Sequence, residues 1–191
     1  MNTTRTEDRM SGTATSEPTI RVPTVEDGGA IWRLVKESQV LDVNSSYAYL
    51  LFCEHFGHTS VLAEHGEGEE RRAVGFVTGF RPPVHPEVIF VWQVAVDASM
   101  RGRGLARRML RALVELPGCG GVDRMWTTVT PSNEASRAMF RSFARSVDAP
   151  VEVRPYFGEE LFPEGGHEPE ELFDIGPFTI PAPQNPTTHE E

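Results

Sequence analysis

The segment Val94–Leu110 reads VAVDASMRGRGLARRML, and its pattern decides the fold class of the chain. The apolar residues at its start are typical of a buried strand, and the apolar spacing after Gly104 is typical of a helix. Between them, Gly102 and Gly104 permit a tight turn, while Arg101 and Arg103 add positive charge. A strand that turns into a helix presents free backbone N–H groups at the positive end of the helix dipole. The segment therefore predicts an anion-binding site.

The same turn excludes two common nucleotide-binding motifs. A Walker P-loop requires Gly-Lys-Ser/Thr after the turn, and this chain has none there. A Rossmann fingerprint requires a third glycine where Arg107 stands. A nucleotide hydrolase is therefore not indicated, and these residues alone leave the identity of the anion open.

Length and composition indicate one globular domain. The chain has 191 residues, of which 39% are hydrophobic, and single cores usually serve roughly 100–200 residues. Residues 1–18 are polar and lack the apolar stretch of a signal peptide, and no apolar run approaches the roughly 20 residues that span a bilayer. We expect a disordered segment over 1–18, one domain over 19–178 and a flexible tail over 179–191. Membrane association is not expected.

The cysteines and the charge restrict the cellular setting and the partners. Cys53 and Cys119 lack metal-ligand spacing, so reduced cytoplasmic thiols and the absence of a metal site are the simpler expectation. The net charge of −10, from 28 acidic and 18 basic residues, argues against binding the phosphate backbone of nucleic acids. The acidic surface could attract a cationic substrate, or it could simply be solvated.

Hydrophobic periodicity predicts an alternation of strands and helices along the chain. Turn-forming residues precede a helix capped near Ser45 or Ser46, and Pro117 with Gly118 ends another helix. Strands are expected at 19–22, 60–64, 73–80, 88–96 and 125–129, with a late β element from Pro150 and a possible last strand at 172–175; helices are expected after Pro23, after Ser45 or Ser46, at 104–116 and after Asn133.

Arg101-x-x-Gly104-x-Ala106 resembles the Gln/Arg-x-x-Gly-x-Gly/Ala signature of the GNAT acetyltransferases. The preceding VWQVAVDASMRG and the later NEASRAMFRSFA stand where that superfamily has its acyl-CoA strand and its second cofactor helix. The resemblance implies an α/β (α+β) GNAT fold with a mixed, mostly antiparallel central sheet flanked by helices. It also implies that backbone amides hold the diphosphate of acetyl-CoA. The cofactor-binding residues implied are Val94, Val96, Arg101, Gly102, Arg103, Gly104, Ala106 and Asn133.

Three further segments indicate which molecule accepts the acetyl group: LDVNSSYAYLLFCEHF, FVWQVAVDASMRGRGLA and HEPEELFDIG. Together they resemble the L-2,4-diaminobutyrate acetyltransferases of ectoine biosynthesis, over roughly Ile20 to Phe178. This resemblance implies acetylation of the γ-amine of L-2,4-diaminobutyrate and a homodimeric enzyme. The acceptor-binding residues implied are Asp42, Tyr47, Trp92, His167 and Glu170.

The residue types suit such an acceptor, because two ammonium groups require carboxylates or aromatic faces. Each residue also has an ordinary structural interpretation. Asp42 could equally cap a turn, and Trp92 on a core strand could serve packing. His167 and Glu170, in an acidic loop, could be plain surface residues. The resemblance is what favours the functional interpretation.

The chemistry requires a base, because an alkylammonium with a pKa near 10 must lose a proton before it attacks a thioester. The neighbouring ammonium of diaminobutyrate lowers that pKa, so a modest base suffices. We expect Glu170 to be the base and Asp42 the ammonium anchor, although the roles could be exchanged. Direct transfer in a ternary complex is expected. Phe140 stands where many superfamily members have a thiolate-protonating Tyr, so another group or solvent must supply that proton.

Two alternatives stay open on the sequence. One is a GNAT enzyme that acetylates protein N-termini or another small amine. The other is a noncatalytic acyl-CoA-binding sensor that regulates a partner. Release of free CoA on mixing with acetyl-CoA and diaminobutyrate distinguishes the sensor from the enzymes.

Overall fold

The computed structural model describes residues 17–163 and 165–180. The segments expected to be flexible, 1–18 and 179–191, fall largely outside these residues. At the start of the described chain, Glu17 forms an ion pair with Arg108, which also donates a hydrogen bond to the carbonyl of Pro18. The chain therefore contacts the domain from Glu17 onward.

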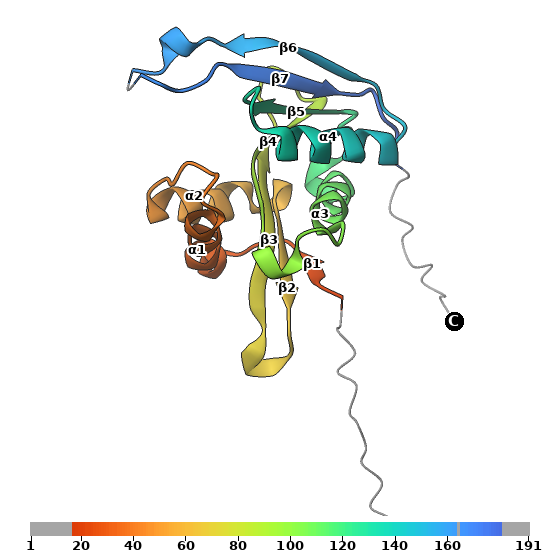
Figure 1. Cartoon of the computed structure of the whole chain (residues 1–191). Coiled ribbons are helices and arrows are strands. Elements are labelled where there is room, and N and C mark those ends of the chain that lie inside the picture. Colours follow the sequence, from red (N-terminus) through yellow and green to blue (C-terminus); the bar gives the residue numbers. More distant parts are fainter. Residues whose placement is uncertain (1–16, 164, 181–191) are drawn as a thin grey trace, which may run out of the picture.

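A seven-stranded sheet runs through the molecule in the order β1-β2-β3-β4-β5-β7-β6 (Figure 1). Every neighbouring pair is antiparallel except β4 and β5, which are parallel. The mixed, mostly antiparallel sheet expected from the sequence is thus confirmed. The strands are β1 Thr19–Arg21, β2 Val61–His65, β3 Arg72–Phe80, β4 Val88–Val96, β5 Arg124–Val129, β6 Val151–Phe157 and β7 Glu170–Ile175.

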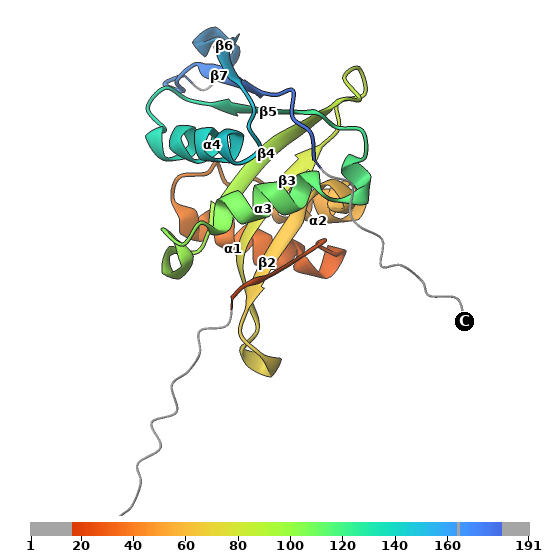
Figure 2. The same cartoon turned by 90° about the vertical axis from the view of Figure 1, so that its right-hand side faces the viewer.

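Helices cover both faces of the sheet, two on each side (Figures 1 and 2). Helices α1 and α2 pack on one face, where Tyr49, Leu62 and Phe76 are fully buried. Helices α3 and α4 pack on the other face, where the larger apolar cluster contains Met109 and Phe143. The helices are α1 Gly28–Ser38, α2 Ser46–Phe56, α3 Leu105–Val114 and α4 Glu134–Ser146.

Helix α3 illustrates how the sequence pattern becomes packing. Leu105, Met109, Leu110 and Leu113 recur at helical spacing and are all buried against the sheet. Burial of each such side chain contributes roughly 1.5–3 kcal/mol, so this face fixes the helix on the sheet. Within the described chain, no helix has the length and apolar character needed to cross a membrane.

The sheet opens between β4 and β5. Their paired residues are confined to Val88–Phe90 and Arg124–Trp126, and beyond them the two strands separate. On its other side β4 carries a bulge, because Val91 pairs with Gly79 whereas Gln93 pairs with Thr78, which leaves Trp92 as the extra residue. The opening and the bulge lie at the same level of β4 and shape the cavities that follow.

Candidate active site

Two cavities adjoin at the opening between β4 and β5. The first has a volume of about 430 Å³ and the second about 390 Å³. Both are lined by Val40, Val94, Ser136 and Met139, so they are parts of one continuous site. Among the described residues, no group of three or more His, Cys, Asp or Glu is arranged to hold a metal ion.

The first cavity lies over the glycine turn that leads into α3. Gly102 and Gly104 both have φ of 74°, the left-handed conformation that glycine adopts without strain. Gly104 is the N-cap of α3, and its carbonyl accepts the first intrahelical bond, from the Arg108 N–H. The N–H groups of the first helical turn therefore lack intrahelical partners and are available to an anion.

Most of the predicted cofactor residues line this first cavity. Arg101 is held in place because its Nε donates to the Val96 carbonyl at 3.2 Å. Arg103 is exposed and is not among the lining residues, whereas Arg107 lines the cavity although we did not assign it a role. The predicted residues that line it are Val94, Val96, Arg101, Gly102, Gly104 and Ala106.

Asn133 lies at the second cavity instead, at the N-terminus of α4. Its side-chain oxygen accepts a hydrogen bond from the Ser136 N–H at 3.0 Å, which caps the helix. Its assignment to the cofactor therefore stays a prediction.

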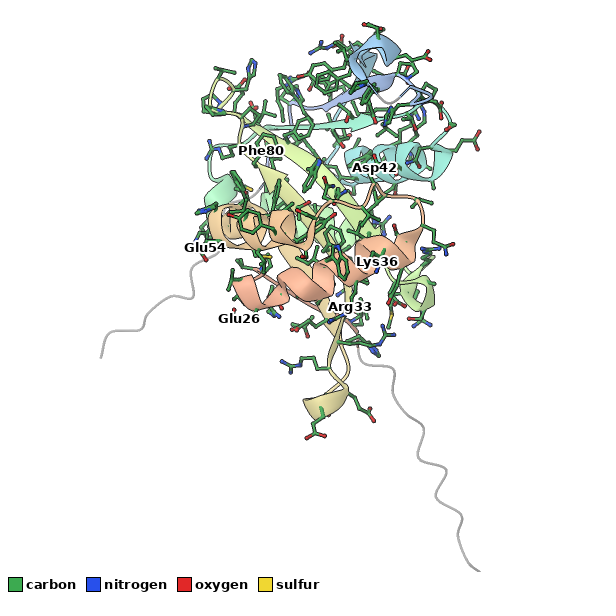
Figure 3. All side chains as sticks on the ribbon, turned by 90° about the vertical axis from the view of Figure 1, so that its left-hand side faces the viewer. Glu26, Arg33, Lys36, Asp42, Glu54 and Phe80 are labelled. Atoms are coloured by element: carbon green, nitrogen blue, oxygen red, sulfur yellow. The ribbon has the colours of Figure 1, made fainter. Side chains whose placement is uncertain are left out.

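The second cavity is polar and brings together residues from distant parts of the chain. Asp42 comes from the segment that joins α1 and α2 (Figure 3), Trp92 from β4, and Glu170 from the start of β7. His167 also lines it, from the loop before β7. Tyr47 does not, and 64% of its surface is exposed. Four of the five predicted acceptor residues thus share one cavity, and the role of Tyr47 stays a prediction.

Glu170 is the most unusual ionisable group in this cavity. Its Oε2 is buried, with no hydrogen-bond partner among the described residues. Burial raises the pKa of its carboxyl above the ordinary value, and the negative charges of Asp42 and Glu168 act in the same direction. His167 opposes the increase in pKa, with its Nε2 at 3.9 Å from Oε1 of Glu170, and the neighbouring Thr128 hydroxyl opposes it as well. A carboxylate with a raised pKa that faces a cavity is suited to accept a proton.

The ring of His167 is held by two contacts. Its Nδ1 lies 2.6 Å from the carbonyl of Glu168, and the ring stacks on Phe162 with centroids 3.8 Å apart. Since a carbonyl only accepts hydrogen bonds, Nδ1 carries a hydrogen, and Nε2 is the ring nitrogen that faces Glu170. Ser132 at the N-terminal end of α4 donates hydrogen bonds to the Glu168 carboxylate, which holds this loop against the helix.

Aromatic rings form a second wall of the cavity. The indole of Trp92 stacks on Phe52 at 4.4 Å and lies 6.1 Å from the ring of Tyr49. These contacts fix Trp92, whose face can attract an ammonium group. Phe140 also lines the cavity and is 3% exposed. It offers no hydroxyl, as the sequence implied.

Several residues of the cavity were not assigned from the sequence. Asn44 belongs to the Asp-x-Asn-Ser segment quoted above, and its polar side chain in a predicted turn could have indicated that it lines the site. Thr128 and Thr130 alternate at the end of β5, where one face of the strand meets the opening. Gln93 carried no signal, because the bulge beside it is invisible in the sequence.

Comparison with known proteins agrees with this geometry. The family model of the GNAT acetyltransferases matches residues 30–144, which is more than half of the chain. The chain belongs to the GNAT acetyltransferase family.

Its relatives narrow the class further. The chain is 50% identical to an L-2,4-diaminobutyric acid acetyltransferase of Halalkalibacterium halodurans over 160 residues, or 84% of this chain and 82% of the relative. It is 49% identical to that of Marinococcus halophilus over 175 residues, or 91% and 99% of the two chains. Within the GNAT family, the chain groups with the L-2,4-diaminobutyric acid acetyltransferases.

A solved structure extends the likeness to three dimensions. It is the diaminobutyrate acetyltransferase EctA from Paenibacillus lautus, in complex with its substrate L-2,4-diaminobutyric acid and coenzyme A. It is 43% identical in sequence, with a TM-score of 0.81 over 88% of this chain and 99% of that one. The GNAT fold expected from the sequence is confirmed.

Proposed function

We propose that this chain transfers the acetyl group of acetyl-CoA to the γ-amine of L-2,4-diaminobutyrate, which yields Nγ-acetyl-diaminobutyrate for ectoine biosynthesis. One observation carries the proposal. A polar cavity with two carboxylates and an aromatic face adjoins a cavity built on an anion-binding helix N-terminus. The relatives named above act on the same diamino acid.

In the proposed reaction, acetyl-CoA lies in the first cavity with its diphosphate at the N-terminus of α3. Its thioester lies at Val94, which lines both cavities, and backbone N–H groups of β4 polarise the carbonyl. The γ-amine attacks that carbonyl directly, so a C–N bond forms and the C–S bond then breaks. The amine proton passes to Glu170, and the CoA thiolate takes a proton from solvent or another group.

The contrast between the two carboxylates favours one assignment of roles. Glu170 is half-buried and has a raised pKa, which suits the base. Asp42 is exposed, and within the described chain its carboxylate has no hydrogen bond or ion pair. It is therefore free to bind the α-ammonium. The neighbouring ammonium keeps the pKa of the γ-amine low enough for Glu170 to act.

An acetyl-cysteine intermediate has no support. Cys53 and Cys119 are buried and line neither cavity. Burial raises the pKa of both thiols to about 11, so thiolate is scarce at neutral pH. Direct transfer within a ternary complex is the simpler route.

A panel of amines tests the proposal, with free CoA thiol as the readout. L-2,4-diaminobutyrate should give much faster release than lysine, ornithine or a peptide with a free N-terminus. Release with peptides but not with diaminobutyrate would favour an N-terminal acetyltransferase. Binding of acetyl-CoA without release for any amine would favour a sensor.

We further propose that the enzyme is a cytoplasmic homodimer, as the resemblance implies. The two cysteines are free, which fits a reducing compartment. The outer edge of the sheet supports self-association, because Tyr156, Phe157 and Leu161 are large, apolar and exposed in or just after β6.

A further inference from the structure

The segment Gln39–Ser45, which joins α1 to α2, lies across both cavities of the site. Val40 lines both, and Asp42 lines the second. Packing holds it only at Leu41, which contacts the apolar cluster of the α1–α2 face, because Val40 is 76% exposed and Val43 is 57% exposed. Hydrogen bonds add to this one apolar contact in fixing the backbone at Asp42, and with it the position of the Asp42 carboxylate.

Gln93 supplies the bond that reaches this segment from the sheet. Its Nε2 donates to the backbone carbonyl of Asp42 at 3.1 Å, across 51 positions of sequence. Its Oε1 accepts from the hydroxyl of Tyr49 at 3.1 Å. Gln93 is 6% exposed and Tyr49 is fully buried, so water does not compete effectively for the bond between them, whereas the bond to Asp42 is partly buried.

Only one orientation of the Gln93 amide satisfies both neighbours. A flipped amide would place Oε1 against the carbonyl of Asp42, and two acceptors repel each other. The Asp42 carbonyl therefore selects the orientation in which the amide donates to it, and the Tyr49 hydroxyl, which can donate or accept, then donates to Oε1 and anchors the side chain. The β4 bulge makes this possible, since the extra residue at Trp92 turns both Trp92 and Gln93 towards the α1–α2 face.

We propose that Gln93 is a positioning residue, held by Tyr49, that places the Asp42 carboxylate for the acceptor ammonium by fixing the Asp42 backbone. The inference rests on the proposed function, because it assumes that Asp42 binds the acceptor. Asn44 shares the task, since its Nδ2 also donates to the Asp42 carbonyl, at 3.3 Å. In this role Gln93 acts through the Asp42 backbone rather than on the reacting atoms.

A double-mutant cycle in the full-length enzyme tests this role. Gln93→Met keeps the length of the side chain but removes both bonds. We expect it to raise KM for diaminobutyrate about tenfold, the usual effect of one lost buried hydrogen bond, with kcat and the acetyl-CoA affinity largely kept. In an Asp42→Asn background the same change should raise KM less than about twofold, because the charge that Gln93 positions is already gone.

The matched control is Thr78→Val. Thr78 is also buried, and its hydroxyl donates to the Gln93 backbone carbonyl at 3.4 Å without reaching the Asp42 segment. It should lower stability and leave KM unchanged. Equal increases in KM for Gln93→Met in both backgrounds, or no increase in either, would overturn the proposal.

Tyr49→Phe provides a second route if Gln93→Met fails to fold, as judged by circular dichroism. It removes one hydroxyl and should raise KM by a smaller factor, again only where Asp42 is intact. An increase that persists with Asp42→Asn, or no increase at all, contradicts the proposal. Failure of the wild-type enzyme to acetylate diaminobutyrate would instead defeat the proposed function, so the two failures are distinguishable.

Discussion

Glu170 and Asp42 are chemically similar residues in different surroundings. Burial raises the pKa of Glu170, and the nearby negative charge of Asp42 adds to that effect. Asp42 is exposed and held through its backbone. One cavity thus contains a carboxylate suited to move a proton and another suited to hold a cation.

Glu170→Gln should lower kcat by about 10²–10⁴-fold, because the amide keeps the shape of the carboxylate but accepts no proton. The sign of the pH effect follows from the raised pKa. A base works only above its pKa. In the pH–rate profile of the wild-type enzyme, the midpoint of the acidic limb should therefore lie above the ordinary Glu pKa of about 4.3. Steady-state rates measured against pH check this.

In the Glu170→Gln variant the limb due to Glu170 should vanish, which leaves only the ionisation of the substrate amine. Titration calorimetry with CoA is the control, and the affinity should be that of the wild type. An identical pH profile in both enzymes would remove Glu170 from the proton transfer.

Asp42→Asn should raise KM for diaminobutyrate about 10- to 100-fold and change kcat little. A hydrogen bond to a charged group contributes about 1.5–3 kcal/mol, and each 1.4 kcal/mol is a factor of ten in affinity. Steady-state kinetics with varied diaminobutyrate measures both constants.

Asp148→Asn is the matched control for Asp42→Asn. Asp148 is exposed in the turn after α4, and its loss removes one negative charge away from both cavities. If both variants raise KM equally, the effect is the general attraction of a cationic substrate rather than a contact with Asp42.

How far the sequence predicts the site depends on the residue. Four acceptor residues could be predicted from the sequence because they stand in motifs with a family resemblance, and they do share a cavity: Asp42, Trp92, His167 and Glu170. Tyr47 has the same motif support but faces solvent. The role of Gln93 could not be predicted from the sequence, since its contacts with Tyr49 and Asp42 depend on how distant segments of the chain meet.

At the scale of elements, the glycine turn before α3 was the most predictable feature. Its chemistry is local, because positive φ and a helix N-terminus can both be inferred from neighbouring residues. The parallel pairing of β4 with β5 and its early end at Phe90 were not predictable. They arise from pairing between segments more than 30 residues apart, with no local signal.

Gly104→Val should weaken CoA binding by about 5- to 100-fold. The reason is the backbone, because a β-branched residue at φ of 74° is strained by about 1–3 kcal/mol. A Cβ at this position would meet only the Arg107 guanidinium, at 3.6 Å, so a steric clash with the protein is not the cause. Isothermal titration with CoA measures the loss.

Gly68→Val is the matched control, since Gly68 also has a positive φ, of 53°, and open surroundings in the β2–β3 loop. It should cost stability without changing the CoA affinity. An unchanged affinity in folded Gly104→Val would remove the turn from the cofactor site.

At the scale of the whole molecule, the exposed apolar residues of β6 predict self-association. Light scattering coupled to size exclusion should give twice the chain mass of 21.2 kDa. Tyr156→Arg combined with Leu161→Arg should shift the enzyme towards monomers, because both side chains are exposed at this edge.

Val84→Arg is the control for that experiment, since Val84 is 81% exposed in the loop between β3 and β4. It should leave the mass unchanged. A wild-type monomer at all concentrations would contradict the proposed homodimer.

The most direct test of the proposed function is the structure of the product. The purified enzyme is incubated with acetyl-CoA and L-2,4-diaminobutyrate, and NMR of the product locates the new amide. We predict an acetyl group on the γ-nitrogen, together with one equivalent of free CoA. Predominant acetylation of the α-nitrogen would mean that the acceptor lies reversed between Asp42 and Glu170, and no acetylated diaminobutyrate at all would contradict the proposed function.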